Sequence, residues 1–154
     1  MATQYHYTES GLDNVWLAGG FEYVDHPSGR HVKIKDIEGL HRAIGETLIQ
    51  RKKNLTGKEF RFLRKEMLMS QAILAKLLEV TEQTMNRWEN GKTDIPGTAQ
   101  SIVKLLYSEH ISTSKHGVQL RQSLKKLSDL EDAIDGLTLT GRVNRGKWHL
   151  DLAA

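Results

Sequence analysis

Hydrogen-bonding side chains crowd into a short stretch near the middle of the chain, and they are Glu82, Gln83, Thr84, Asn86 and Arg87. Glutamine and asparagine can pair with adenine, arginine can pair with guanine or a phosphate, and threonine can bond to a base edge or touch a thymine methyl group. Met85 and Trp88 interrupt the polar residues at helical spacing. On a helix these two apolar residues turn inward, so the polar side chains point outward together. The pattern predicts a helix that reads bases in the major groove, with Gln83, Thr84 and Arg87 on the bases and with Asn86 and Glu82 at the edge.

Two short helices joined by a tight turn are needed to hold that surface. Ser70 can cap the first helix and Thr81 the second, because each side-chain oxygen can accept a bond from an amide of the following turn. The residues between the helices, Leu78 to Val80, form the turn. Positions that must touch the core or the partner helix are apolar or small, namely Leu74, Ala75, Leu78, Val80, Met85 and Trp88. The stretch from Ser70 to Gly91 therefore predicts a helix-turn-helix. The alternative is a helical hairpin that packs but binds no DNA.

The same stretch resembles the Cro/C1-type (XRE) helix-turn-helix family. The usual run of that family appears here as Ser70-Gln71, Leu74-Ala75, Val80-Thr81 and the segment Trp88-Glu89-Asn90-Gly91. The resemblance covers roughly Leu55 to Ile111 and implies a five-helix DNA-binding domain. It also implies that Gln71 bonds a phosphate and braces Gln83.

Two positions depart from the family pattern. Glu79 stands in the turn and Leu68 stands before the first motif helix, and the family commonly has glycine at both places. If the backbone is left-handed there, each residue with a side chain costs about 1 kcal/mol.

Basic residues cluster just before the motif, as Arg51, Lys52, Lys53, Lys58, Arg61, Arg64 and Lys65. The formal charge of +3 and the isoelectric point of about 9.1 are only mildly basic, so the position of these residues says more than the composition does. Such a cluster is often a solvated helix face, but beside a helix-turn-helix it favours phosphate contacts. We expect the phosphate contacts to come from Gln71, Thr81, Arg61, Arg64, Lys65 and Lys92.

Helices are predicted on both sides of the motif. Thr56 and Glu59 form a capping box that starts a helix running to about Met67, with Arg61, Arg64 and Lys65 left to solvent or phosphate. After the motif, a helix starts around Asp94 to Pro96, because proline suits the first helical position. Its apolar residues, which we expect to close the core, are Ile102, Val103, Leu105 and Leu106.

The N-terminal region predicts a small antiparallel sheet and a helix. Strand-like runs flank Gly19-Gly20 and suggest a hairpin, and His31 to Lys35 follows as a third strand. Asp36 can cap a helix that runs to about Gln50, with a buried face of Ile37, Leu40, Ile44 and Leu48. This arrangement before an XRE domain resembles the MqsA-type antitoxins. Their zinc-binding cysteines are absent from this sequence, so zinc is not carried over.

The C-terminal region predicts a helix and a hairpin. Val118 to Ile134 carries leucines at the spacing of a helical seam, which can pair with a second copy or pack back on the N-terminal sheet. Leu137 to Leu152 alternates as two strands around the turn Asn144 to Gly146. Gly141, Gly146 and Lys147 partly match a phosphate loop, but Trp148 stands where Ser or Thr would hold magnesium and no helix follows.

Together these features predict an α+β protein. Its expected parts are residues 1–54 with the sheet and helix, 55–111 with the DNA-binding domain, and 112–154 with the helix and hairpin. The function expected is a double-stranded DNA-binding transcriptional regulator, an autoregulating repressor that binds a palindromic operator as a homodimer. The alternative is an antitoxin or adaptor whose main partner is a toxin or another protein. No motif for catalysis, a cofactor or a metal is present, and without a membrane-length apolar run or secretion signal the expected location is the cytoplasm.

Overall fold

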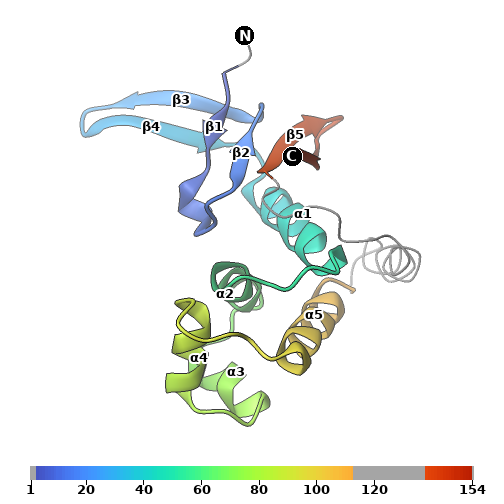
Figure 1. Cartoon of the computed structure of the whole chain (residues 1–154). Coiled ribbons are helices and arrows are strands. Elements are labelled where there is room, and N and C mark those ends of the chain that lie inside the picture. The colour runs from blue at the N-terminus through green and yellow to red at the C-terminus, as the bar shows by residue number, and fades with distance from the viewer. Residues whose placement is uncertain (1–2, 113–137, 154) are drawn as a thin grey trace. The chain divides into compact units, whose positions relative to one another are not determined.

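The computed structural model describes residues 3–112 and 138–153 and divides into two compact units (Figure 1). The terminal unit contains the described residues 3–44 and 138–153, and the helical unit contains residues 45–112. Helices and strands both occur, so the predicted α+β class is confirmed. None of the helices within the described ranges is long and apolar enough to cross a membrane.

The terminal unit joins the two ends of the chain in one sheet. Its strands are β1 (Tyr5–His6), β2 (Val15–Leu17), β5 (Thr138–Asn144) and β6 (Lys147–Ala153), in the order β1-β2-β5-β6, and the short 3-10 helix η1 (Thr8–Ser10) follows β1. β2 runs antiparallel to β1 and parallel to β5, with Val15 opposite Leu139. Val15, Leu17 and Leu139 are fully buried. The sequence leaves this pairing open, and the structure shows that the terminal segments share a core.

The hairpin predicted around Gly19-Gly20 is wrong. β2 belongs to the four-stranded sheet, whereas β3 (Phe21–His26) pairs with β4 (Gly29–Ile34) in a separate two-stranded sheet. Gly20 has a φ of 74°, and a Cβ there would lie 2.5 Å from the ring of Trp148. The indole nitrogen of Trp148 donates to the carbonyls of Lys35 and Asp36 at 2.8 and 2.9 Å. The glycine therefore makes room for a tryptophan from the far end of the chain.

The C-terminal hairpin is confirmed. β5 and β6 are antiparallel around a two-residue turn, Arg145-Gly146, in which φ is 50° and 75°. The predicted helix from Val118 to Ile134 and most of the linker before it lie outside the described residues.

Helix α1 (Ile37–Gln50) contributes to both units, since the boundary between them falls after Ile44. The Asp36 carboxylate accepts a bond from the Gly39 amide at 3.1 Å, as expected of a cap. Leu40, Ile44 and Leu48 are buried as predicted, whereas the prediction for Ile37 is wrong because it is 46% exposed.

The helical unit contains α2 (Gly57–Glu66), α3 (Gln71–Leu77), α4 (Glu82–Glu89) and α5 (Gly97–Ile111). Its core is formed by Phe60, Leu63, Leu74, Met85, Val103 and Tyr107, all of which are almost completely buried. Pro96 is the N-cap of α5 and not its first helical residue. Ile102 and Leu105 are exposed, so the prediction that they close the core is wrong, and Val103 and Tyr107 fill that place.

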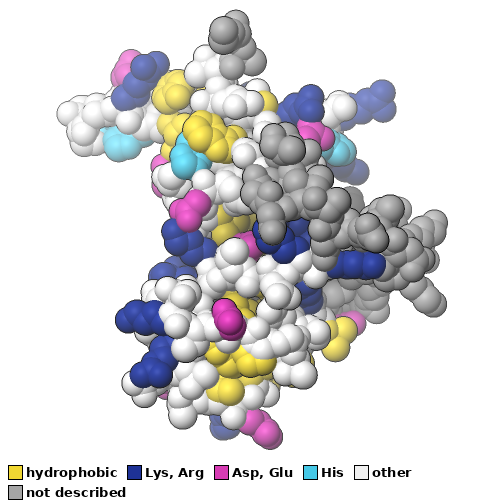
Figure 2. All heavy atoms as spheres, viewed as in Figure 1, with side chains coloured by type: hydrophobic (Ala, Val, Ile, Leu, Met, Phe, Trp, Pro, Cys, Tyr) yellow, Lys and Arg dark blue, Asp and Glu magenta, His cyan; other side chains and the backbone are white. Residues whose placement is uncertain are grey.

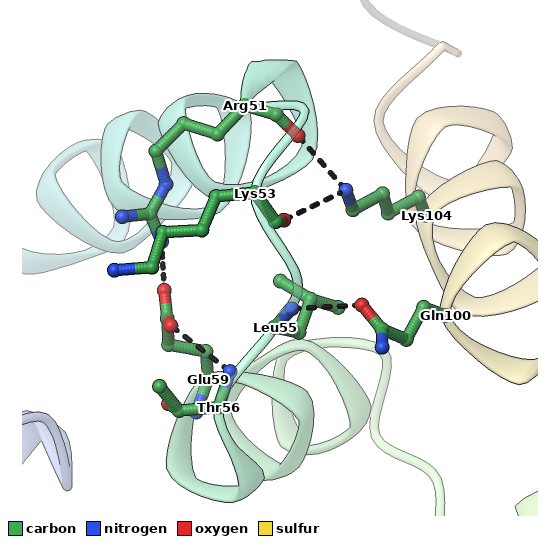
Figure 3. A network of polar contacts seen from close by, with 7 residues as sticks. All are labelled: Arg51, Lys53, Leu55, Thr56, Glu59, Gln100 and Lys104. Atoms are coloured by element: carbon green, nitrogen blue, oxygen red, sulfur yellow. Dashed lines mark hydrogen bonds and ion pairs between the residues drawn. The ribbon is translucent and has the colours of Figure 1, made fainter. Parts of the chain in front are cut away.

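Polar contacts hold the segment between α1 and α2 against α5 (Figure 3). The Lys104 ammonium donates to the carbonyl of Arg51 at 2.8 Å and lies 3.5 Å from that of Lys53. The Gln100 side chain, which is buried, accepts a bond from the Leu55 amide at 2.8 Å. These contacts satisfy backbone groups of the segment, including the amide of the buried Leu55, so they fix the chain as it enters α2.

The predicted capping box at the start of α2 is confirmed. The Thr56 hydroxyl accepts from the Glu59 amide, and the Glu59 carboxylate accepts from the Thr56 amide. The same carboxylate is buried and forms an ion pair with Arg51 (Figure 3). The first residue of the basic cluster thus has an internal partner.

Candidate nucleic-acid interface

The two predicted motif helices are α3 and α4, and both begin with the predicted caps. The Ser70 hydroxyl accepts from the Ile73 amide and the Thr81 hydroxyl accepts from the Thr84 amide, each at 3.1 Å. Each cap satisfies one of the free amides of a helix start, which typically stabilises a helix by about 1 kcal/mol. The short connection between α3 and α4 therefore has two well-defined ends.

Helix α4 separates its side chains sharply between two faces. Met85, Trp88 and Glu89 are buried, with exposures of 0, 5 and 4%. The outer face is polar and consists of the exposed residues Glu82, Gln83, Asn86 and Arg87 and the half-buried Thr84. The structure thus places all five expected base-reading residues on one short helix, with the apolar residues between them turned inward.

Some of these polar side chains have partners and others have none. Gln83 and Arg87 form no side-chain hydrogen bond or ion pair with any residue that the structure describes. Thr84 Oγ1 lies 2.9 Å from the hydroxyl oxygen of the capping Thr81. Asn86 Oδ1 already accepts a bond from the side chain of Asn90 at 3.0 Å. The donor groups best able to form new bonds on this face are therefore those of Gln83 and Arg87, and the exposed Glu82 carboxylate is an acceptor that likewise has no partner among the described residues.

A buried polar cluster joins the inner face of α4 to α2 and α3. Arg64 is 7% exposed and binds both carboxylate oxygens of Glu89, through Nε at 2.5 Å and Nη2 at 3.0 Å. Arg64 Nη1 also donates to the carbonyl of Met69 at 2.7 Å, and Gln71 Nε2 donates to Glu89 at 2.7 Å. One carboxylate thereby receives donors from two other helices.

This cluster changes the roles expected of two residues. The expectation that Arg64 is open to solvent is wrong, because its side chain is buried and its donors serve the protein itself. Its Nε, Nη1 and Nη2 already donate to Glu89 and Met69, so we expect no phosphate contact from it. Gln71 is half-buried, and its bond goes to Glu89 and not to Gln83. Its amide nitrogen keeps a second hydrogen that is available to a phosphate.

The other expected phosphate ligands lie at the surface of the helical unit. Arg61 and Lys65 are exposed on α2, Lys92 is exposed just after α4, and Thr81 is exposed at the start of α4. Figure 2 shows Lys and Arg side chains on the side of the molecule where Figure 1 places α3 and α4. Exposed cations near a base-reading helix can add affinity that does not depend on sequence.

Helices α2, α3 and α4 all end in the same way, with a residue in left-handed conformation. These residues are Leu68, Glu79 and Gly91, with φ of 56°, 55° and 68°. In each case the next amide bonds back to the last helical turn, for example from Met69 to the carbonyl of Arg64 at 3.2 Å. This is the Schellman arrangement, in which glycine is favoured. Leu68 and Glu79, which depart from the glycine common in the family, therefore do adopt the left-handed conformation.

Helices α3 and α4 are both capped and are joined by a tight turn, and α4 buries its apolar side while it exposes hydrogen-bonding groups. This arrangement defines a helix-turn-helix domain. Residues 60–99 match a family described as helix-turn-helix. The match and the geometry together identify this part of the chain as a helix-turn-helix domain of the Cro/C1 (XRE) type, which supports a DNA-binding regulator. No curated protein and no solved structure matches the chain. The resemblance of the N-terminal region to MqsA-type antitoxins stays a prediction.

The sequence predicts a cap at Glu59 but not the ion pairs that Glu59 and Glu89 form inside the protein. Both are nearly inaccessible to solvent, at 5 and 4%, and each pairs with an arginine of the basic cluster. The signal for Glu89 is its helical spacing, because it lies four residues after the inward Met85 and so falls on the same face of α4. A buried charge needs a partner, so the burial of Glu89 would have predicted that a nearby arginine such as Arg64 is buried with it.

Proposed function

We propose that the protein is a sequence-specific transcriptional repressor that binds double-stranded DNA by inserting α4 into the major groove. The observation that carries the proposal is the outer face of α4, where Gln83 and Arg87 have no partner among the described residues while Met85 and Trp88 anchor the helix from below. A helix held from one side presents its other side in a fixed orientation, as base readout requires.

The residues on this face differ in their capacity to read bases. Arg87 can bind guanine through two parallel hydrogen bonds, and Gln83 can bind adenine in the same way. Thr84 contributes a hydroxyl and a methyl group. Asn86 lies at the edge because its side-chain oxygen already accepts from Asn90, and Glu82 can accept a bond from cytosine.

Phosphate contacts fix the position of α4 on the duplex. We assign them to the exposed Arg61, Lys65 and Lys92, together with Gln71 and Thr81. Arg64 supports this surface from inside by binding Glu89 and the carbonyl of Met69.

We further propose that the repressor acts as a homodimer on a palindromic operator. One helix contacts only a few base pairs, and two-fold symmetry doubles the sequence that is read. Half-sites for such a dimer are about 34 Å apart, or about 10 base pairs. Sedimentation of the protein with its operator duplex is expected to give two chains per duplex. If one chain binds a single half-site and the affinity does not rise when the second half-site is added, the dimer is contradicted.

The decisive experiment compares Arg87→Ala and Arg87→Lys by fluorescence anisotropy on the DNA upstream of the protein's own gene and on a scrambled duplex. The wild type is expected to prefer its own upstream DNA. Loss of a base contact costs about 1 to 3 kcal/mol, or about 5- to 150-fold in affinity, on that DNA alone. Lysine keeps the charge but cannot form the paired bonds, so Arg87→Lys is expected to lose most of the same preference.

A different pattern would overturn this assignment. If Arg87→Ala weakens both duplexes equally and Arg87→Lys binds as well as the wild type, Arg87 contacts a phosphate and not a base. Equal, weak binding of the wild-type protein to both duplexes at every salt concentration would exclude autoregulation through this DNA. Repression itself is tested with a reporter under the upstream DNA, whose output is expected to fall when the protein is present and to recover with Arg87→Ala.

A further inference from the structure

The β5–β6 hairpin of the terminal unit has one apolar and one polar face. Residues opposite each other on antiparallel strands share a face, and Asn144 lies opposite Lys147 while Arg142 lies opposite His149. All four of these side chains are exposed. The alternate residues include Leu139, which is fully buried, and Trp148, which is 7% exposed. The sheet is therefore anchored by its apolar face and presents basic and amide groups on the other.

The acid on this polar face is already neutralised. Asp151 forms an ion pair with Arg142 across the two strands. Arg145 and Lys147, in contrast, form no ion pair with any residue in the described part of the chain. Positive charge is thus concentrated at the tip, and Figure 2 shows it projecting from the hairpin that Figure 1 labels β5.

The same tip is hollowed. A cleft of about 430 Å³ is lined, among the described residues, by Asn144, Arg145, Lys147 and His149. Each of these side chains can donate hydrogen bonds, and none is an acid. These four side chains suit an anion with several acceptor oxygens, which is the chemistry of a phosphate group.

The backbone at the tip gives an independent reason to consider the arginine functional. Arg145 is the first central residue of a two-residue turn and has a φ of 50°, where hairpins favour asparagine, aspartate or glycine. An arginine at this position weakens the turn, and it forms no hydrogen bond or ion pair with a described residue that would compensate. Strain of this kind is often retained where the side chain has a function.

We propose that the tip of the β5–β6 hairpin, formed by Asn144, Arg145, Lys147 and His149, is a second phosphate-binding site and contacts the sugar-phosphate backbone of duplex DNA. This inference rests on the DNA binding proposed above. The site adds affinity independent of base sequence, because arginine and lysine address phosphate oxygens that every base pair presents alike. Free phosphate or a mononucleotide presents the same chemistry, so the experiment must distinguish these sources.

The test uses the full chain with the double substitution Arg145→Asn and Lys147→Gln, titrated by anisotropy against the upstream and scrambled duplexes over a range of salt. Two lost phosphate contacts are expected to lower the slope of log affinity against log salt by about 2 in magnitude. Affinity for both duplexes is expected to fall by the same factor, with their ratio unchanged. An unchanged slope on both duplexes overturns the proposal.

A matched control separates the site from net charge. The double substitution Arg30→Gln and Lys33→Gln removes the same charge from the exposed strand β4 of the same unit, and it is expected to leave the slope almost unchanged. An equal loss in both double variants assigns the effect to net charge and overturns the site. Because asparagine suits the turn better than arginine does, Arg145→Asn alone is expected to raise the melting temperature, so that weaker binding is not a result of unfolding.

Calorimetry with inorganic phosphate and with a mononucleotide completes the test. Weak or absent binding of both, together with the loss of duplex affinity, supports a DNA contact. If either small anion binds tightly and the double variant keeps its affinity for the duplex, the proposed DNA contact is overturned. The scrambled duplex also separates the two proposals. If the wild type shows no sequence preference but the salt slope still falls in the hairpin variant, autoregulation through this DNA is excluded and the hairpin site is retained.

Discussion

The guanidinium of Arg64 meets both carboxylate oxygens of Glu89, at 2.5 and 3.0 Å, although the two residues are 25 positions apart in the chain. Both side chains are almost fully buried. The pair links α2 to the inner face of α4, directly behind the exposed groups that we assign to base reading. Because both side chains are buried, we expect the pair to hold α4 in place and not to contact DNA.

Glu89→Gln is expected to destabilise the helical unit strongly. It leaves the Arg64 guanidinium buried without a countercharge, which costs about 3 to 5 kcal/mol. The measurement is the free energy of unfolding in urea. The control is Arg61→Gln, at an exposed position of the same helix as Arg64, which should change the free energy of unfolding by less than about 0.5 kcal/mol. Replacing both partners, as in Arg64→Met with Glu89→Met, should cost less than Glu89→Gln alone. A loss as small as that of Arg61→Gln would show that the pair is not buried in solution.

Leu68→Gly and Glu79→Gly are each expected to stabilise the protein by about 1 kcal/mol, because glycine adopts the left-handed conformation at a helix end without steric conflict. Thermal unfolding followed by circular dichroism measures the change. Gly91→Ala, at the equivalent end of α4, should lower stability by a similar amount. If the glycine variants melt earlier than the wild type, these two backbones are not left-handed.

Lys65→Gln and Arg64→Gln should affect DNA binding in different ways. Removing the exposed lysine is expected to weaken binding to all duplexes alike and to reduce the salt slope by about 1. Arg64→Gln should lower stability and leave the salt slope of the folded fraction unchanged, because its charge faces Glu89. Anisotropy at several salt concentrations, at a temperature where both variants are folded, makes the comparison. A reduced slope for Arg64→Gln would restore this residue as a phosphate ligand.

Gly20→Ala is expected to destabilise the terminal unit by about 2 to 4 kcal/mol, the sum of a left-handed alanine and an overpacked contact. The added Cβ would meet the Trp148 ring at 2.5 Å and Val143 at 2.6 Å. Gly19→Ala is the matched control, since nothing lies within 4 Å of a Cβ there. Tryptophan fluorescence during urea unfolding reports the result, and equal midpoints for the two variants would mean that Trp148 does not pack on Gly20.

Local signals in the sequence predicted the helical unit well. Ser70, Thr81 and the capping box of Thr56 with Glu59 each satisfy helix amides a few residues away, so neighbouring residues alone determine where these helices start. The inward positions of Met85 and Trp88 also follow from helical spacing.

Predictions failed where the outcome depended on contacts between distant residues. Gly19-Gly20 has the composition of a hairpin turn, but the strand beside β2 comes from the other end of the chain. Arginine is usually found at the surface, but Arg64 is buried because it pairs with the buried carboxylate of Glu89. Both outcomes depend on a partner that spacing cannot identify.

The parallel pairing of β2 with β5 also determines when each part of the protein can form. Residues 15 and 139 must meet, so the terminal sheet has to wait until the strand around residue 139 has left the ribosome. The contacts of α2 to α5 are made within residues 57–111, and this part can fold while synthesis continues. During that interval β2 has an unpaired edge, which is a site for association with other chains. The helix-turn-helix part of the protein can therefore form before the terminal sheet is complete.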